Sequence, residues 1–180
     1  MDPHLIGHIN EIISKERGYV NHPDDLGGET NFGITKKTAE KFGYVGEMVD
    51  MQIDTARDIY ARFYWDEPRL DLIQQHSSII ALEVLDTGVN IGMHRAIKFL
   101  QRALNAFNKK GEWYTDLVVD GVMGENTRHA LKLYFNRRSL HGEYVLSKAL
   151  NCLQGEYYIA AAEAREENES FVFGWIKDRA

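Results

Sequence analysis

The sequence predicts a mainly α-helical fold with one small β element near the N-terminus. Apolar residues recur at spacings of three and four through most of the 180 residues, which is typical of amphipathic helices. Glycine and polar turn residues interrupt this spacing early in the chain, where an irregular hairpin is expected. Because 44% of the residues are hydrophobic and 27% are charged, the chain has enough apolar surface to form a core.

The first helix is expected over residues 4–17. Leu5, Ile9 and Ile12 follow one another at helical spacing and therefore share one face. Gly18 is a suitable residue for ending this helix, because glycine adopts the left-handed conformation that often follows a helix.

The next part of the chain is expected to form a hairpin and two short helices. Residues 19–34 are rich in turn formers, and residues 30–34 can supply a short strand. Thr35 is expected to cap a short helix that ends at Gly43, and Asp54 is expected to cap the next helix.

The second half of the chain is expected to be helical apart from one long connection. The expected segments are a helix from Ser77 or Ser78 to a break at 90–92, a helix to Phe107, a connection over 108–124, helices over 125–135 and 143–167, and an aromatic tail over 171–175. The tail should pack back on the body of the protein, because large aromatic side chains gain most from burial.

Composition and charge exclude several classes of protein. With 21 Lys and Arg against 27 Asp and Glu, the net charge is −6, which argues against a general nucleic-acid binder. A single cysteine allows no intramolecular disulfide. The sequence has no apolar run long enough for a membrane span, and its start lacks the pattern of a secretory signal.

The positive charge is concentrated in one segment. Residues 95–138 contain nine Lys or Arg and four Asp or Glu, so this segment carries +5 while the rest of the chain carries −11. A basic segment in an acidic chain suggests an anionic polymer as partner. A solvated helix face is the alternative interpretation, because charged residues usually serve solvation.

Glu16 is the most informative residue of the first helix. It continues the stripe of Leu5, Ile9 and Ile12, which predicts that its carboxyl group faces the interior or a cleft. Desolvation and the negative end of the helix dipole both raise the pKa of such a carboxyl group. A raised pKa suits a general acid, and a structural carboxylate paired with an arginine is the alternative.

The loop after this helix supplies a second carboxylate. Asp25 lies nine positions after Glu16, and Thr30 lies five positions further on. Two carboxyl groups in unlike environments form the pattern used in glycoside hydrolysis, although an aspartate after Pro23 also suits an ordinary turn. The His, Asp and Glu residues nearby fit neither the calcium-loop nor the zinc-protease spacing, so no metal or cofactor is expected.

Several motifs occur between residues 16 and 92, namely Glu16-Arg17-Gly18-Tyr19-Val20-Asn21, Pro23-Asp24-Asp25, Gly27-Gly28-Glu29-Thr30-Asn31, Gly33-Ile34-Thr35, Ile59-Tyr60, Tyr64-Trp65, Asp86 and Val89-Asn90-Ile91-Gly92. This set resembles glycoside hydrolase family 108, a family of lysozyme-like N-acetylmuramidases found among bacteriophage endolysins and bacterial proteins. The later segments Leu100-Gln101-Arg102-Ala103-Leu104, Asp120-Gly121-Val122-Met123-Gly124 and Phe173-Gly174-Trp175 resemble the peptidoglycan-binding domain that accompanies this family.

The resemblance implies a lysozyme-like muramidase domain over residues 1–94 and a helical peptidoglycan-binding domain over 95–180. It implies hydrolysis of the β-1,4 bond between N-acetylmuramic acid and N-acetylglucosamine, with Glu16 as general acid. By similarity to phage lysozymes, Asp25 and Thr30 would complete the catalytic set. The chain departs from the family pattern at Arg17, where glycine is usual; a cation beside Glu16 would lower the pKa of the acid.

Five further residues are candidates for binding the sugar strand. They are Tyr19, Asn31, Tyr64, Trp65 and Asn90. A structural role is the alternative for each, since aromatic residues at helical spacing usually belong to the core and an asparagine at a helix break can be a cap.

The sequence as a whole favours a peptidoglycan hydrolase that acts as a phage endolysin. Its expected partner is the glycan strand of peptidoglycan, and we expect a monomer with neither nucleic-acid binding nor membrane insertion. Such a protein would collect in the host cytoplasm and reach the cell wall through a holin-type pore. Two alternatives stay open, a weakly active or non-hydrolytic scaffold that binds peptidoglycan, and a secreted bacterial muramidase toxin.

Overall fold

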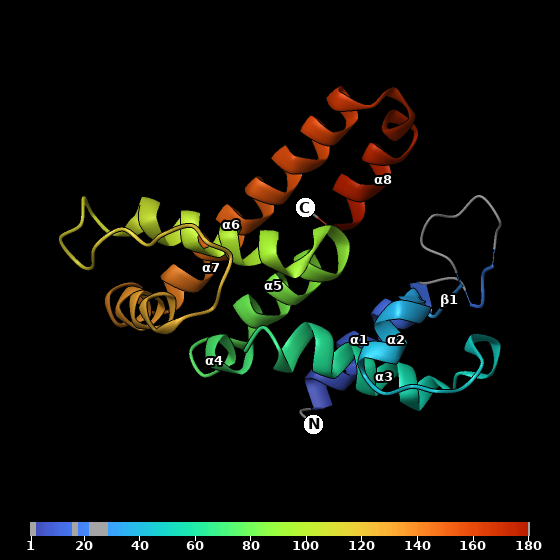
Figure 1. Cartoon of the computed structure of the whole chain (residues 1–180). Coiled ribbons are helices and arrows are strands. Elements are labelled where there is room, and N and C mark those ends of the chain that lie inside the picture. The colour runs from blue at the N-terminus through green and yellow to red at the C-terminus, as the bar shows by residue number, and fades with distance from the viewer. Residues whose placement is uncertain (1–2, 16–17, 22–28, 180) are drawn as a thin grey trace. The chain divides into compact units, whose positions relative to one another are not determined.

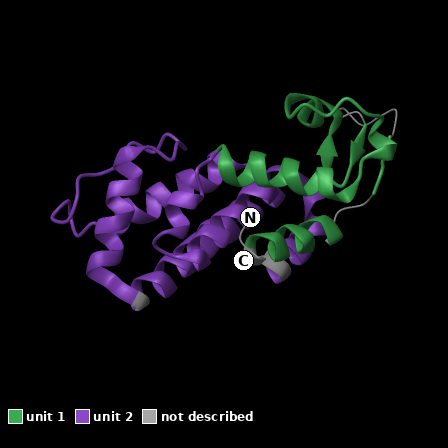
Figure 2. Ribbon diagram, turned by 90° about the horizontal axis from the view of Figure 1, so that it is seen from below, with its two compact units in different colours: residues 1–67 green, residues 68–180 purple. Residues whose placement is uncertain are grey.

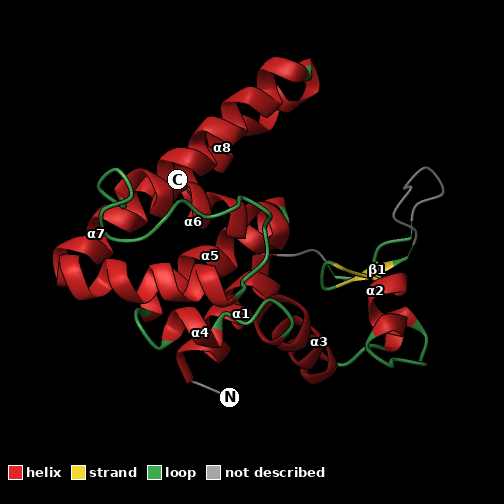
Figure 3. Cartoon of the chain, turned by 60° about the vertical axis from the view of Figure 1, so that its left-hand side comes forward, coloured by secondary structure: helices red, strands yellow, loops and turns green. Residues whose placement is uncertain are grey.

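The computed structural model describes residues 3–15, 18–21 and 29–179, and divides into two compact units, residues 1–67 and 68–180 (Figure 2). Helices dominate each unit. The strands among the described residues form one two-stranded antiparallel sheet, seen in yellow in Figure 3. The prediction of a mainly α-helical fold with a small hairpin near the N-terminus is therefore confirmed.

Unit 1 is built on the first helix, α1 (Pro3–Lys15). Leu5, Ile9 and Ile12 are at most 3% exposed, so the predicted apolar stripe is the buried face of this helix. The stripe packs against α3 (Ile53–Ala61), whose own buried residues recur at helical spacing. The position of Glu16 on this stripe stays a prediction, because residues 16–17 lie outside the described residues.

The hairpin pairs β1 (Thr30–Asn31) with β2 (Ile34–Thr35). Phe32 and Gly33 form the turn between them, with φ of 51° and 74°. Two successive positive φ angles define the tight turn whose twist matches that of antiparallel strands. Glycine adopts this conformation at little cost, whereas Phe32 needs support, and the Tyr60 hydroxyl group donates a hydrogen bond of 3.0 Å to its carbonyl.

Of the two helix caps predicted for this region, Thr35 is confirmed and Asp54 is not. Thr35 caps α2 (Lys36–Lys41) as predicted, accepting a hydrogen bond from the Thr38 backbone N–H at 3.2 Å. The turn η1 (Met48–Asp50) follows. The prediction that Asp54 caps the next helix is wrong: α3 begins one residue earlier, and Asp54 lies in its first turn, paired with Arg57.

Unit 2 consists of helices and one long connection. Its helices are α4 (Asp71–Gln74), α5 (Ser78–Ile91), α6 (Met93–Phe107), α7 (Glu125–Ala164), the turn η3 (Glu166–Asn168) and α8 (Glu169–Arg179). Ser77 caps α5, and Gly92, with φ of 94°, separates α5 from α6, both as predicted. Helix α8 folds back along the C-terminal part of α7 (Figure 1).

The two helices predicted over 125–135 and 143–167 are confirmed: they are the two parts of α7 and meet at a kink, with no loop between them. Ser139 has φ of 50° and ψ of −145°, which is not helical, and both flanking segments continue the helix up to it. The segment between the two predicted helices contains no proline, so the helix is bent there without being replaced by a loop. Neither α7 nor any other described helix has the length and apolar character needed to cross a membrane.

The connection between α6 and α7 is fastened to the fold by Gln101. Its side chain is 1% exposed; Nε2 donates to Asp120 Oδ1 at 2.8 Å and to Val122 O at 3.1 Å, and Oε1 accepts from the Gly121 N–H at 2.8 Å. Gly121 has φ of 72°, and a Cβ there would lie 2.5 Å from the carbonyl oxygen of His94. The Asp-Gly motif thus has a structural reason.

Candidate active site

The structure describes some of the predicted site residues and not others. Glu16 and Asp25 both lie outside the described residues, so their catalytic roles stay predictions. The remaining predicted site residues of unit 1 are described, namely Tyr19, Thr30, Asn31, Tyr64 and Trp65, while Asn90 belongs to unit 2. In the described part of the chain, no three His, Cys, Asp or Glu side chains gather into a metal-binding group.

Thr30 lies at the centre of the local backbone pairing. Its N–H donates to Val20 O at 2.9 Å, and its carbonyl accepts from Val20 N–H at 2.9 Å. On its other side, Thr30 pairs with Thr35 of β2. Val20, which follows α1 in the sequence, is therefore hydrogen-bonded to the hairpin.

A second fastening joins the same two segments through side chains. The Tyr19 hydroxyl group donates to Glu29 Oε1 at 2.8 Å, and Lys36 Nζ donates to Glu29 Oε2 at 2.8 Å. We call these three residues, Tyr19, Glu29 and Lys36, the Glu29 clamp. The clamp connects Tyr19, Glu29 just before β1 and the first turn of α2.

The electrostatics of the clamp are self-consistent. Hydrogen bonds from Lys36 and Tyr19 lower the pKa of the Glu29 carboxyl group, because they favour its charged form. The same contacts raise the pKa of the Lys36 ammonium group and of the Tyr19 hydroxyl group. At neutral pH the glutamate is charged and both partners keep their protons, so the clamp is fully formed.

Asn31 is buried, and its contact is with the protein. Its side chain is 4% exposed, and Nδ2 donates to the carbonyl oxygen of Met48 at 2.6 Å. This hydrogen bond ties β1 to the turn η1. The structure therefore favours the structural alternative for Asn31.

Tyr64 and Trp65 belong to a single π-helical turn, η2 (Arg62–Asp66). Trp65 is 5% exposed and is part of the core of unit 1, as expected for an aromatic residue at helical spacing. Tyr64 is half-buried, stacked on Tyr60 with ring centroids 5.3 Å apart and edge-on to Phe63 at 4.6 Å. Of the two, Tyr64 is the one with surface available to a ligand.

Asn90 lies in the last turn of α5. Its Nδ2 donates to the backbone carbonyl of Asp86 at 2.8 Å and to Asp86 Oδ2 at 3.3 Å. The amide is exposed, and its hydrogen bonds lie within α5, whose C-cap is Gly92 and not Asn90.

One carboxyl group of unit 2 has a strongly shifted pKa. Burial between α5 and α7 raises the pKa of Glu83 to about 7, the charge of Asp86 contributes in the same direction, and a hydrogen bond from Ser147 opposes it. Glu83 therefore titrates near neutral pH, although spacing alone did not single it out.

Several residues of the basic segment are engaged within unit 2. The guanidinium group of Arg95 lies 4.5 Å from the centroid of the Tyr157 ring and donates to Ile91 O at 2.7 Å. Arg138 lies over Trp113 at 4.6 Å, and Arg128 pairs with Glu125. These contacts favour the interpretation of a solvated, internally compensated helix face over that of a dedicated polyanion site.

Comparison with known proteins agrees with the two sets of motifs. Residues 9–92 match the family described as Glycosyl hydrolase 108, and residues 95–180 match the family described as Predicted Peptidoglycan domain. Residues 9–92 thus form a domain of glycosyl hydrolase family 108. Together the two matches make the chain a glycoside hydrolase that acts on peptidoglycan, with peptidoglycan as its binding partner.

A solved structure, that of SagA from Brucella abortus, is similar in fold to this family 108 protein. The similarity covers 97% of each chain with a TM-score of 0.57 and 23% sequence identity. No curated protein matches the chain in sequence.

Sequence reasoning did not assign a role to two residues of the family 108 region. Glu29 lies inside the matching segment Gly27-Gly28-Glu29-Thr30-Asn31, and Lys36 opens α2. Tyr19 and Glu29 are ten positions apart, and this spacing predicts no contact by itself. Their contact depends on the pairing of Val20 with Thr30. The motif itself was the available signal for Glu29.

Proposed function

We propose that this family 108 protein is an N-acetylmuramidase that hydrolyses the β-1,4 bond between N-acetylmuramic acid and N-acetylglucosamine. The observation that carries the proposal is the pairing of Val20 with Thr30, together with the Glu29 clamp. Glycoside hydrolysis requires two carboxyl groups held at a defined separation. In the sequence, Glu16 precedes Val20 by four positions and Asp25 precedes Thr30 by five, so each predicted catalytic residue is only a few positions from a residue of this pairing.

Each catalytic residue has a separate task in the proposed reaction. Glu16 donates its proton to the glycosidic oxygen as the bond to the sugar breaks. Asp25 stabilises the positive charge that develops on the sugar ring or orients the attacking water, and the Thr30 hydroxyl group helps to hold that water. Of the five predicted sugar-binding residues, Tyr19 and Tyr64 have polar, solvent-accessible rings that can line the sugar strand.

The test of this proposal is mass analysis of cell wall digested by the purified protein. New reducing ends on N-acetylmuramic acid are expected. Reducing ends on N-acetylglucosamine, anhydro-muramic ends or cut peptides would each contradict the assignment. A protein that binds sacculi without cutting them would favour the non-hydrolytic scaffold, for which the departure from the family pattern at Arg17 is the motivating feature.

We further propose that the protein serves as a phage endolysin that acts as a monomer and reaches the wall through a holin-type pore. The support is the match to family 108, which the sequence resemblance connects with phage endolysins. Expression in a bacterium with and without a co-expressed pore tests this role. Lysis only when the pore is present is expected; lysis without it would favour a different route of delivery.

A further inference from the structure

Helix α8 is packed on α7 through one of its faces. The ring of Trp175 lies 5.5 Å from the ring of Tyr158 of α7, and Phe171 stacks on Trp175 at 6.1 Å. Tyr158 is 4% exposed, so this contact closes the end of the unit 2 core. The prediction that residues 171–175 pack back on the protein is confirmed for Trp175, whereas Phe171 is 58% exposed.

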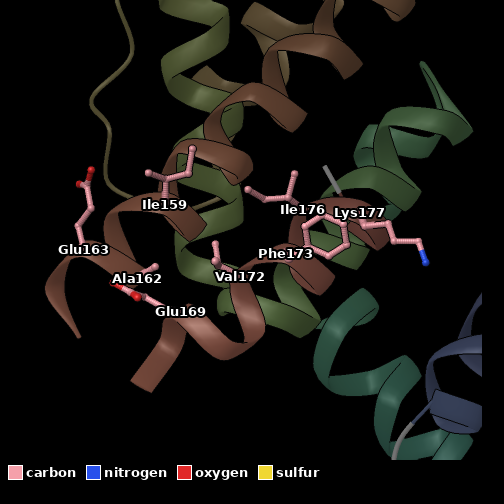
Figure 4. Close-up of a pocket in the computed structure, with 8 residues that line it drawn as sticks. All are labelled: Ile159, Ala162, Glu163, Glu169, Val172, Phe173, Ile176 and Lys177. Carbon is pink, nitrogen blue, oxygen red and sulfur yellow. The ribbon is translucent and has the colours of Figure 1, made fainter. Parts of the chain in front are cut away.

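The opposite, apolar side of α8 lines an open groove of about 430 Å³ (Figure 4). Val172, Phe173 and Ile176 form one wall, and Ile159 and Ala162 of α7 form the other. Phe173 is 79% exposed and Ile159 is 50% exposed. A contiguous apolar surface of this kind costs hydration free energy when it is left open, and in a soluble protein it marks an interaction site.

The ends of the groove carry opposite charges. Glu163 and Glu169 lie at one end, and the ammonium group of Lys177 extends from the other, with the apolar side chains between them (Figure 4). The ion pairs found among the described residues leave all three of these side chains unpaired. The groove therefore presents two carboxylates, an apolar middle and a cation in sequence.

We propose that this groove binds the peptide stem of peptidoglycan, an inference that depends on peptidoglycan being the partner of this protein. A stem peptide has small methyl side chains, a free amino group on its diamino acid and a terminal carboxylate. These groups match the apolar middle, the Glu163 and Glu169 end, and the Lys177 end. Neutral N-acetylated sugars would leave the charges at both ends without partners, so the peptide fits the groove better than the glycan.

The direct test is a two-dimensional NMR titration of the full chain with the synthetic stem pentapeptide that has lysine at its third position. We expect a dissociation constant on the order of 1 mM, with chemical-shift changes concentrated in amides of residues 159–177. No change at saturating peptide, or changes confined to other residues, would overturn the proposal. Equal changes with the peptide-free disaccharide would assign the groove to the glycan instead.

Two exposed side chains of the groove can be changed with little effect on folding. Phe173→Ser is expected to weaken peptide binding about ten-fold and Lys177→Gln about three-fold. Ile79→Ser and Lys148→Gln are matched controls, because both residues are exposed and lie on other surfaces of unit 2. Unchanged binding in both groove variants would contradict the assignment, as would an equal loss in the controls.

Two further readouts separate the possible failures. Sedimentation of the free protein detects a second copy in the groove: a dimer that Phe173→Ser dissociates would overturn the proposal in favour of self-association. Mass analysis of digested wall is performed on the same samples. Normal muramidase products without peptide binding would exclude only the groove, whereas peptide binding without these products would exclude only the proposed catalytic function.

Discussion

The two units of this family 108 protein use their polar motif residues in opposite ways. In unit 1, Tyr19, Glu29 and Lys36 contact one another near the surface and fasten a loop. In unit 2, Gln101 is buried and fastens the backbone of the Asp120-Gly121 turn from inside. Polar residues on loops are commonly functional, whereas polar residues that are buried and fully hydrogen-bonded are commonly structural. The same kind of motif therefore points to chemistry in unit 1 and to folding in unit 2.

The largest expected effect on the rate of wall hydrolysis, and the strongest test of this difference between the units, is at Glu16. Glu16→Gln should lower the rate of wall hydrolysis by about 10²- to 10⁴-fold, because a general acid contributes an amount of this size. The urea midpoint of the protein should change little. Turbidity loss of purified sacculi measures the rate, and Glu11→Gln, on the exposed face of α1, is the control. Full activity of Glu16→Gln would remove the catalytic role from unit 1.

A large effect of the opposite kind is expected at Gln101. Gln101→Leu leaves the buried N–H of Gly121 without its partner and removes the hydrogen bonds from Gln101 Nε2 to Asp120 Oδ1 and Thr127 Oγ1. Unsatisfied buried groups of this kind should lower the free energy of unfolding by about 3 kcal/mol. Urea denaturation measures the loss, and Gln52→Leu, at an exposed glutamine of unit 1, is the matched control. Activity per folded molecule should stay normal at low temperature.

The sequence predicted the features that depend on local pattern and missed those that depend on contacts between elements. Helical periodicity identified the buried stripe of α1, the cap at Thr35 and the break at Gly92, because these depend on local pattern. The interruption between residues 135 and 143 was also predicted, and the structure places it at Ser139. The π-helical turn of Tyr64 was not predicted, since it has no local sequence pattern of its own. The Glu29 clamp escaped prediction because its three members meet only after Val20 pairs with Thr30.

A third prediction concerns the pH dependence of unit 2. The pKa of Glu83 is raised to about 7 in the folded protein, above the ordinary value of 4.5. The folded state therefore binds a proton more tightly, so stability is fully present below pH 4.5 and is lost as the pH rises to about 7. Glu83→Gln removes this dependence and should stabilise the protein at pH 8 by about 1–3 kcal/mol.

The measurement is the urea midpoint at pH 5 and pH 8 for the wild type and the variant. The exposed Glu156 of α7 provides the control Glu156→Gln, which should keep the pH dependence of the wild type. The buried environment assigned to Glu83 would be contradicted if the urea midpoint of the wild type rose between pH 5 and pH 8 and the midpoint of Glu83→Gln rose by the same amount.

The smallest expected effect sharpens the comparison, because it tests whether the Glu29 clamp acts on catalysis or only on folding. Glu29→Gln keeps the shape of the side chain and removes its charge, so the contacts with Tyr19 and Lys36 weaken. If the clamp positions the loop that carries Asp25, the rate of wall hydrolysis should fall about three- to ten-fold at saturating substrate.

Tyr19→Phe should lower the rate less than Glu29→Gln, because it removes one of the two hydrogen bonds to Glu29 and leaves the contact with Lys36. Glu40→Gln, on the exposed side of α2, should leave the rate unchanged. Since the clamp lies near the surface, none of these changes should shift the melting temperature by more than a few degrees. A fall in melting temperature with an unchanged rate of wall hydrolysis would show that the clamp, like Gln101, stabilises the fold. In that case no described side chain of unit 1 would have a demonstrated link to the chemistry.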